Sequence, residues 1–164
     1  QAAGLPGIYF VASVEAIDYW VLNFAPSQGY DALTAYNYHR GFSGTYIASE
    51  PFSQSYAELD MGYRKSWDWI LANSTLPYFV PVTSGWDARP WRPAGVIDTH
   101  DQSAGTVVGF RTHLQAAKAR LDANPVKSKK TLMVCCWNEF GEGSYIEPTI
   151  KDGTQYLQQI KDVF

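Results

Sequence analysis

Residues 131–148 read TLMVCCWNEFGEGSYIEP, a short apolar run that leads directly into a loop rich in carboxylates and aromatic rings. The run itself, 131–137, is continuously apolar, which is typical of a strand covered on both faces. Earlier short runs over 7–14, 31–38 and 76–83 predict three more strands. Together with the helical patterns between them, these strands predict an α/β fold.

Helical patterns follow each of these strands. Apolar residues recur at helical spacing over 17–24, 56–70 and 107–121, and a last helix is expected over 153–163. Ser55 and Glu58 have the spacing of a capping box at the start of the second helix. The order is therefore strand then helix, four times over, which predicts a parallel sheet with crossover helices.

Two architectures share this pattern: an open doubly wound sheet, and four units of a (β/α)8 barrel. A full barrel takes about 250 residues, whereas this chain has 164. Either arrangement places an active site at the carboxyl ends of the strands. None of the predicted strands is followed by a glycine-rich phosphate loop, which disfavours nucleotide binding.

Composition narrows the class of partner. With 13 Lys and Arg against 16 Asp and Glu, the chain has no basic surface of the kind that nucleic acid needs. The longest apolar run, 7–14, is far shorter than the roughly 20 residues of a membrane span. No secretory signal is seen, and Gln1 in place of Met is expected of a processed or shortened chain. The three lysines within 127–130 are expected in a solvated loop.

The two cysteines are neighbours, Cys135 and Cys136, on a predicted strand. Adjacent side chains of a strand point to opposite faces, so we expect no bond between them. Their spacing also matches no metal-binding pattern.

The loop after the fourth strand holds three carboxylates, Glu139, Glu142 and Glu147, together with Asn138 and Tyr145. It contains no Lys or Arg. Two carboxyl groups in unlike environments are what acid/base cleavage of glycosides uses. A solvated acidic loop, whose glutamates cap the last helix or pair with remote arginines, is the structural alternative on these residues alone.

The third strand ends in a segment that carries Trp86, Asp87, Arg89 and Trp91. Its indole rings offer flat faces to sugar rings, and its charged groups offer hydrogen bonds to hydroxyl groups. The structural alternative is that the rings cover the end of the sheet while Asp87 and Arg89 form an ion pair.

The second strand ends in Tyr36, Asn37 and Tyr38, with the two tyrosines expected on one face and Asn37 on the other. The three histidines are interpreted as structural or surface residues: His39, His100 next to Asp98 and Asp101, and, on the surface of a helix, His113. The carboxylates around His100 have no recognised ligand spacing, so no metal site is predicted.

These residues resemble a known family. Residues 137–143, with Glu147-Pro148, Gly153 and Tyr156-Leu157, resemble the terminal motif of glycoside hydrolase family 99 and its WbsX-like relatives, which occur in polysaccharide-biosynthesis loci. Residues 85–87 with 89–90 resemble a second motif, from the WbsX-like side, and 31–38 a third. The resemblance runs in order through residues 5–164.

The family fold is a (β/α)8 barrel, so the resemblance implies that residues 1–164 are the C-terminal half of a single catalytic domain. A half barrel leaves two sheet edges open, and the missing N-terminal half or another copy of the chain is the partner expected there. The resemblance also implies a carbohydrate substrate, no metal and no other cofactor. Its hydrolases favour an extracytoplasmic location, and its biosynthetic members a cytoplasmic one.

Family 99 enzymes are retaining endo-acting α-mannosidases and α-mannanases. One glutamate deprotonates the 2-hydroxyl of the substrate, which attacks the anomeric carbon, and a second glutamate three residues on protonates the leaving oxygen. The resemblance implies Glu139 as the base and Glu142 as the acid/base. It places Tyr145 and Glu147 along the sugar site, and Asn138 where it orients a carboxylate.

Two features depart from the hydrolases. Phe140-Gly141 stands where they have Trp-His between the two glutamates, and the second motif is closer to the WbsX-like group. A WbsX-like glycosyltransferase or polysaccharide-biosynthesis protein is therefore one alternative. A non-catalytic glycan-binding module is the other.

Overall fold

The computed structural model describes residue 4 and residues 6–38, 53–91 and 102–164. These residues form a mixed α/β structure in which each predicted strand is present in shortened form. The four strands are β1 (Val11–Ser13), β2 (Ala32–Thr34), β3 (Val80–Thr83) and β4 (Leu132–Cys135).

A helix follows each strand, as the periodicity predicts. The π-helical turn η1 (Tyr19–Phe24) continues into the short helix α1 (Ala25–Ser27) after β1. The others are α2 (Tyr56–Asn73) after β2, α3 (Val107–Ala123) after β3 and α5 (Gln155–Val163) after β4. The alternation of strand and crossover helix is therefore confirmed.

The start of α2 shows why it begins where it does. The Ser55 side chain accepts a hydrogen bond from the Glu58 N–H at 3.2 Å, as in a capping box. The Glu58 carboxylate accepts from the N–H of Gln54 at 2.6 Å, one residue before the position that the motif predicts. Both bonds satisfy amide groups that have no partner within the helix.

The lysine run is more ordered than expected. Residues Pro125–Ser128 form the short helix α4 where we expected a loop. The Lys127 ammonium group donates to the carbonyl oxygen of Ser74, and partial burial lowers its pKa.

All four strands are parallel and follow one another in chain order. β1 pairs with β2, and β3 pairs with β4. Between them, Leu33 of β2 accepts from the N–H of Phe79 and donates to the carbonyl of Pro77, both at 2.8 Å. Within the described residues, the outer edges of β1 and β4 pair with no further strand.

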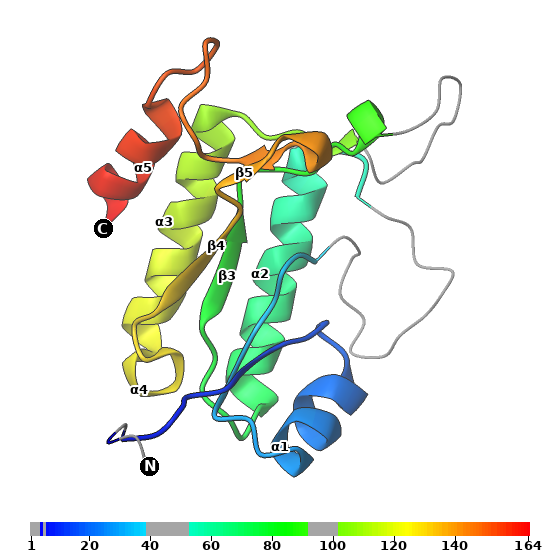
Figure 1. Ribbon diagram of the computed structural model, residues 1–164, viewed down its shortest axis with the longest axis vertical. Coiled ribbons are helices and arrows are strands. Elements are labelled where there is room, and N and C mark those ends of the chain that lie inside the picture. Colours follow the sequence, from blue (N-terminus) through cyan, green and yellow to red (C-terminus); the bar gives the residue numbers. More distant parts are fainter. Residues whose placement is uncertain (1–3, 5, 39–52, 92–101) are drawn as a thin grey trace.

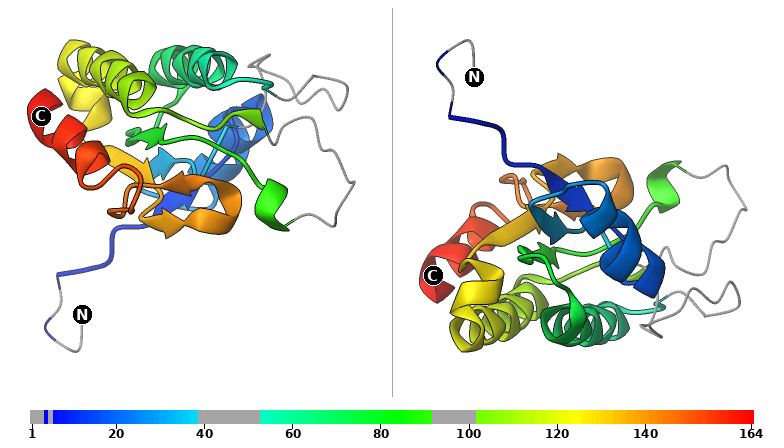
Figure 2. Two further views of the ribbon diagram at one scale, coloured as in Figure 1. Left: turned by 90° about the horizontal axis from the view of Figure 1, so that it is seen from above. Right: turned by 90° about the horizontal axis from the view of Figure 1, so that it is seen from below.

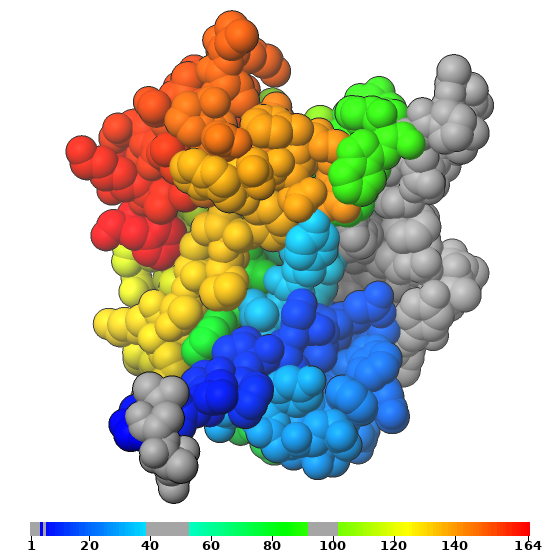
Figure 3. Space-filling model, in the orientation of Figure 1, coloured from blue at the N-terminus to red at the C-terminus, as the bar shows by residue number. Residues whose placement is uncertain are grey.

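Helices α2 and α3 lie side by side against one face of β3 and β4, and α5 lies beside α3 (Figures 1 and 2). Figure 3, in the orientation of Figure 1, shows the face of the molecule away from α2 and α3, where the segments around β1, β2 and β4 reach the surface. The core lies between the strands and the helices. Its largest fully buried side chains are Trp67, Tyr63, Tyr78, Phe110, Leu33 and Leu59.

Among the described residues, no helix has both the length and the apolar character to cross a membrane.

His113 lies in this core, and the prediction that it is a surface residue is wrong. Its ring is fully buried between α2 and the end of β3. Nε2 accepts from the Thr83 N–H at 3.3 Å, so Nδ1 carries the proton and donates to the Asp60 carboxylate at 2.7 Å. The helical period that places Phe110 and Leu114 in the core also covers position 113, and this signal could have shown its burial.

The prediction that the two cysteines are not bonded is also wrong, because a disulfide joins Cys135 to Cys136. The prediction assumed an extended strand through both residues. β4 instead ends at Cys135, so the alternation of a strand does not extend to Cys136.

The buried imidazole predicts a fold that is sensitive to acid. Burial holds the pKa of His113 below its ordinary value, so the unfolded chain binds this proton more readily than the folded one. The free energy of unfolding is therefore highest above about pH 6.5 and falls as pH drops below it, by up to about 1.4 kcal/mol per pH unit. Despite the opposing effect of burial, hydrogen bonds from His113 and Arg64 lower the pKa of Asp60, which adds a further loss at lower pH.

Urea unfolding between pH 8 and pH 5 measures this dependence. His113→Gln removes the titrating ring and keeps His39 and His100 as they are, so its stability should change less over this range. Parallel pH profiles for the parent and His113→Gln would contradict the assignment.

Candidate active site

The carboxylate-rich loop after β4 folds into a hairpin. β5 (Asn138–Glu139) and β6 (Ser144–Tyr145) pair antiparallel, with the 3-10 turn η4 (Phe140–Glu142) between them. We call residues 138–145 the glutamate hairpin. It lies at the carboxyl ends of β3 and β4 (Figure 1), where parallel α/β folds place their sites.

Tyr36, just beyond β2, reaches this hairpin from another strand. Its hydroxyl donates a hydrogen bond to Oε2 of Glu142. Partial burial, this hydrogen bond and the charges of Glu142 and Glu139 all raise the pKa of Tyr36, so the hydroxyl keeps its proton at neutral pH. The charges of both carboxylates therefore reach the phenol group of Tyr36. Tyr36 is 46% exposed, so a ligand can contact it.

The loop after β3 holds the hairpin from a third strand. The Asp87 N–H donates to the carbonyl oxygen of Glu142 at 2.6 Å. The two loops approach closely at Gly143, where a Cβ atom would lie 2.7 Å from the Asp87 nitrogen. Gly143 also has a φ of +65°, which favours glycine.

Asp87 and Arg89 form the ion pair that the structural alternative describes. The Arg89 Nε donates to the Asp87 carboxylate at 2.7 Å, and this bond lowers the pKa of Asp87. Each of these two charges therefore has a counter-charge within the loop.

Trp91 lies against the turn between the two glutamates. It ends the short helix η2 (Arg89–Trp91), which packs on η4. A Cβ atom on Gly141 would overlap the indole ring, so the ring occupies the space of the missing side chain. Trp91 is nevertheless 64% exposed.

Three of the candidate residues lie instead in the interior: Asn37, Tyr38 and Trp86. The Asn37 side-chain oxygen accepts from the hydroxyl of Tyr63 at 2.5 Å, and the Tyr38 hydroxyl lies 2.8 Å from that of Tyr78. Tyr36 and Tyr38 do not share a face, because β2 ends at Thr34 and its alternation does not extend to them. Contact of these three with substrate stays a prediction.

The remaining candidates lie within the hairpin or, in the case of Glu147, two residues beyond it. Asn138 is exposed, and Glu147 is half-buried with its N–H donated to the carbonyl of Trp137 at 2.9 Å. The ring of Tyr145 packs on that of Phe140 with centroids 4.8 Å apart. Sequence reasoning left out Trp137 and Phe140 as site residues, although both are about half exposed. Trp137 lies two residues before Glu139 in the chain, and Phe140 directly follows it.

The buried hydroxyl groups of Ser144 and Thr83 connect the hairpin to β3 and β4. The Ser144 hydroxyl donates to the carbonyl of Cys135 at 3.0 Å and lies 3.1 Å from the hydroxyl of Thr83. Ser144 pairs with Glu139 across the hairpin. Small polar residues of this kind give no signal in a single sequence, so neither was a candidate.

In the part of the chain that the structure describes, no group of three or more His, Cys, Asp or Glu side chains could hold a metal ion. His39, His100, Asp98 and Asp101 lie outside the described residues.

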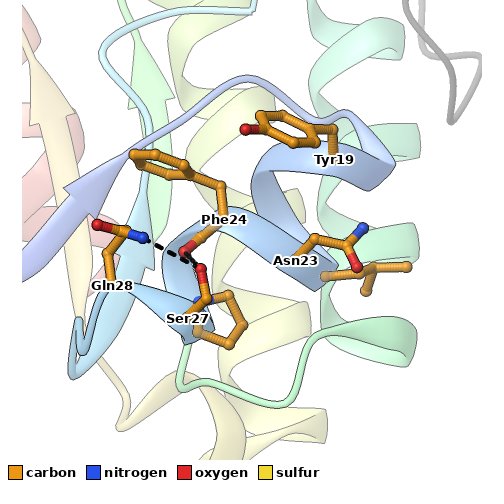
Figure 4. Close-up of a pocket in the computed structure, with 7 residues that line it drawn as sticks. Tyr19, Asn23, Phe24, Ser27 and Gln28 are labelled. Atoms are coloured by element: carbon orange, nitrogen blue, oxygen red, sulfur yellow. Dashed lines mark hydrogen bonds between the residues drawn. The ribbon is translucent and has the colours of Figure 1, made fainter.

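A separate surface groove runs along η1 and α1 (Figure 4). All of its lining residues come from this one segment: Tyr19, Leu22, Asn23, Phe24, Pro26, Ser27 and Gln28. None of them is a candidate residue of the hairpin site.

Comparisons with known proteins bear on family and fold. A family model described as Glycosyltransferase WbsX matches residues 1–160. None of the curated proteins matches the chain. A solved structure described as a glycoside hydrolase-like protein aligns over 96% of this chain with a TM-score of 0.67 and 16% sequence identity. The chain spans 44% of that protein's length, and at this identity the likeness concerns the fold.

The close approach at Gly143 predicts a measurable loss of stability. Gly143→Ala and the matched control Gly153→Ala both place a side chain at a positive φ, at a cost of about 1 kcal/mol each. Only position 143 has Asp87 in the way, whereas position 153 is open. We expect Gly143→Ala to lower the free energy of unfolding by a further amount of about 1–3 kcal/mol. Equal losses in urea unfolding would show that the two loops do not pack as described.

Proposed function

The chain belongs to the family described as Glycosyltransferase WbsX, and we propose that it acts on glycans as a cleaving enzyme, with its site at the glutamate hairpin. The proposed reaction is retaining, endo-acting hydrolysis of α-linked mannoside-type glycans. The observation that carries the proposal is the convergence of Tyr36, Glu139 and Glu142 from two strand ends.

The proposed chemistry divides between the two glutamates. Glu139 takes the proton of the substrate's 2-hydroxyl, whose oxygen then attacks the anomeric carbon. Glu142 gives a proton to the glycosidic oxygen as its bond to that carbon breaks. Glu142 then deprotonates a water molecule, whose oxygen attacks the anomeric carbon. The bond from that carbon to the 2-oxygen breaks, and Glu139 returns its proton to the 2-oxygen, so both carboxyl groups regain their starting states.

The surroundings supply orientation. The Tyr36 hydroxyl holds one oxygen of Glu142, which leaves the other free for the leaving group. The backbone of Glu142 is held by Asp87. Trp91 and Tyr145 provide aromatic surface on two sides of the hairpin, which suits the apolar faces of sugar rings.

The proposal extends to architecture: residues 1–164 form the C-terminal half of a (β/α)8 catalytic barrel. Support comes from the four parallel strands in chain order, the outer strand edges without a partner among the described residues, and the 44% coverage of the hydrolase-like structure. Further βα units, from the N-terminal half of the barrel or from another copy of the chain, would pair with β1 and β4.

The family description favours a second candidate, a glycosyltransferase or biosynthesis protein. A nucleotide-sugar donor calls for a phosphate site, and no described strand is followed by a glycine-rich phosphate loop. An assay with labelled nucleotide sugars separates the two candidates. A hydrolase forms product in the absence of the donor, whereas a transferase forms product only when the donor is present. Binding without turnover, unaffected by changes at the glutamates, would instead identify a glycan-binding module.

Exchange of either glutamate tests the catalytic roles. Glu139→Gln and Glu142→Gln should each lower the release of reducing ends from an α-linked mannan at least about 100-fold, because each removes a proton-transfer group. Glu15→Gln changes an exposed carboxylate just before η1 and serves as the matched control. Release near the parent rate by both site variants would disprove the proposal.

The hydrogen bond from Tyr36 makes a separate prediction. Tyr36→Phe removes a donor to a charged group and keeps the ring, so kcat should fall about tenfold to a hundredfold. The loss should shrink with an activated leaving group such as a nitrophenolate, which needs little protonation. Tyr19→Phe, on the exposed face of η1, is the control. The same loss for both leaving groups would argue against action through Glu142.

A further inference from the structure

The turn between the two glutamates has no side chain at Gly141, and the missing side chain leaves room for a neighbouring ring. The backbone at Gly141 is not in the left-handed region, so its conformation alone does not demand glycine. The space of its Cβ atom is occupied by the indole ring of Trp91. The glycine is therefore required by the neighbouring ring and not by the turn.

The contact fixes Trp91 beside the proposed acid/base. Its edge lies against Gly141, the residue before Glu142, and the loop that carries it is joined to the Glu142 carbonyl through the Asp87 N–H. With 64% of its surface exposed, most of the indole remains available to a ligand. The ring thus has a fixed edge and a free surface next to one carboxylate.

We propose that Trp91 and Gly141 form one coupled specificity element, in which the empty position 141 seats the indole as a platform for a pyranose unit adjoining Glu142. This inference rests on the proposed glycan site and adds to it the residue that selects the substrate. The ligand is a sugar with an apolar face of ring hydrogens, which can pack on an aromatic surface. A side chain at 141 would displace the platform, because it would overlap the indole ring.

A double-mutant cycle tests the coupling. Binding is measured by calorimetry with α-linked mannotetraose, β-linked mannotetraose and maltotetraose, in the Glu142→Gln background so that no sugar is consumed. Trp91→Ala and Gly141→Ala should each weaken binding of the preferred sugar about tenfold. The double variant should lose no more than Trp91→Ala alone, because both changes remove the same platform. Tyr19→Ala, which removes another exposed aromatic ring, should leave binding unchanged.

A spectroscopic measurement follows the ring itself. The indole N–H resonance of Trp91 is assigned by its loss in Trp91→Ala, and Gly141→Ala should shift it strongly in the absence of sugar. An unshifted resonance, losses that add in the double variant, or binding that Trp91→Ala leaves unchanged would each overturn the inference alone. Failure of the parent background to bind any of the three sugars would overturn the proposed function as well.

Discussion

Thr83, at the carboxyl end of β3, joins the helical layer to the glutamate hairpin. Its N–H bonds to the buried ring of His113, and its hydroxyl lies 3.1 Å from that of Ser144. The first bond requires a neutral imidazole with its proton directed to Asp60. The second holds the strand that pairs with Glu139. The position of the candidate site therefore depends on a buried polar network, which is costly to leave partly unsatisfied.

Parallel strands in chain order explain how distant residues meet. Each βα unit returns the chain to the same end of the sheet, so the carboxyl ends of β2, β3 and β4 become neighbours. Tyr36 and Glu142 are 106 positions apart and still share a hydrogen bond. The candidate site therefore forms only where the ends of three strands meet, and the segment that contains both glutamates does not form it alone.

Two glycines let these strand ends approach. Gly143 gives room to the backbone of Asp87, and Gly141 gives room to the ring of Trp91. Between them stands Glu142, held at its carbonyl by one loop and at its carboxylate by Tyr36. For the proposed acid/base, these supports would orient the carboxyl group before substrate arrives.

Periodicity and capping are local properties, so the amino-acid pattern alone predicts the alternation of strands and helices, the N-cap of α2 at Ser55 and the carboxylate-rich loop after β4. The sequence could not show that His113 contacts Thr83 and Asp60, that Tyr36 faces outward while Tyr38 turns inward, or that Cys135 and Cys136 are bonded. Those features depend on where strands end and on which neighbours arrive from elsewhere in the chain. Tertiary structure decided them, since only packing brings α2, β3 and the hairpin together.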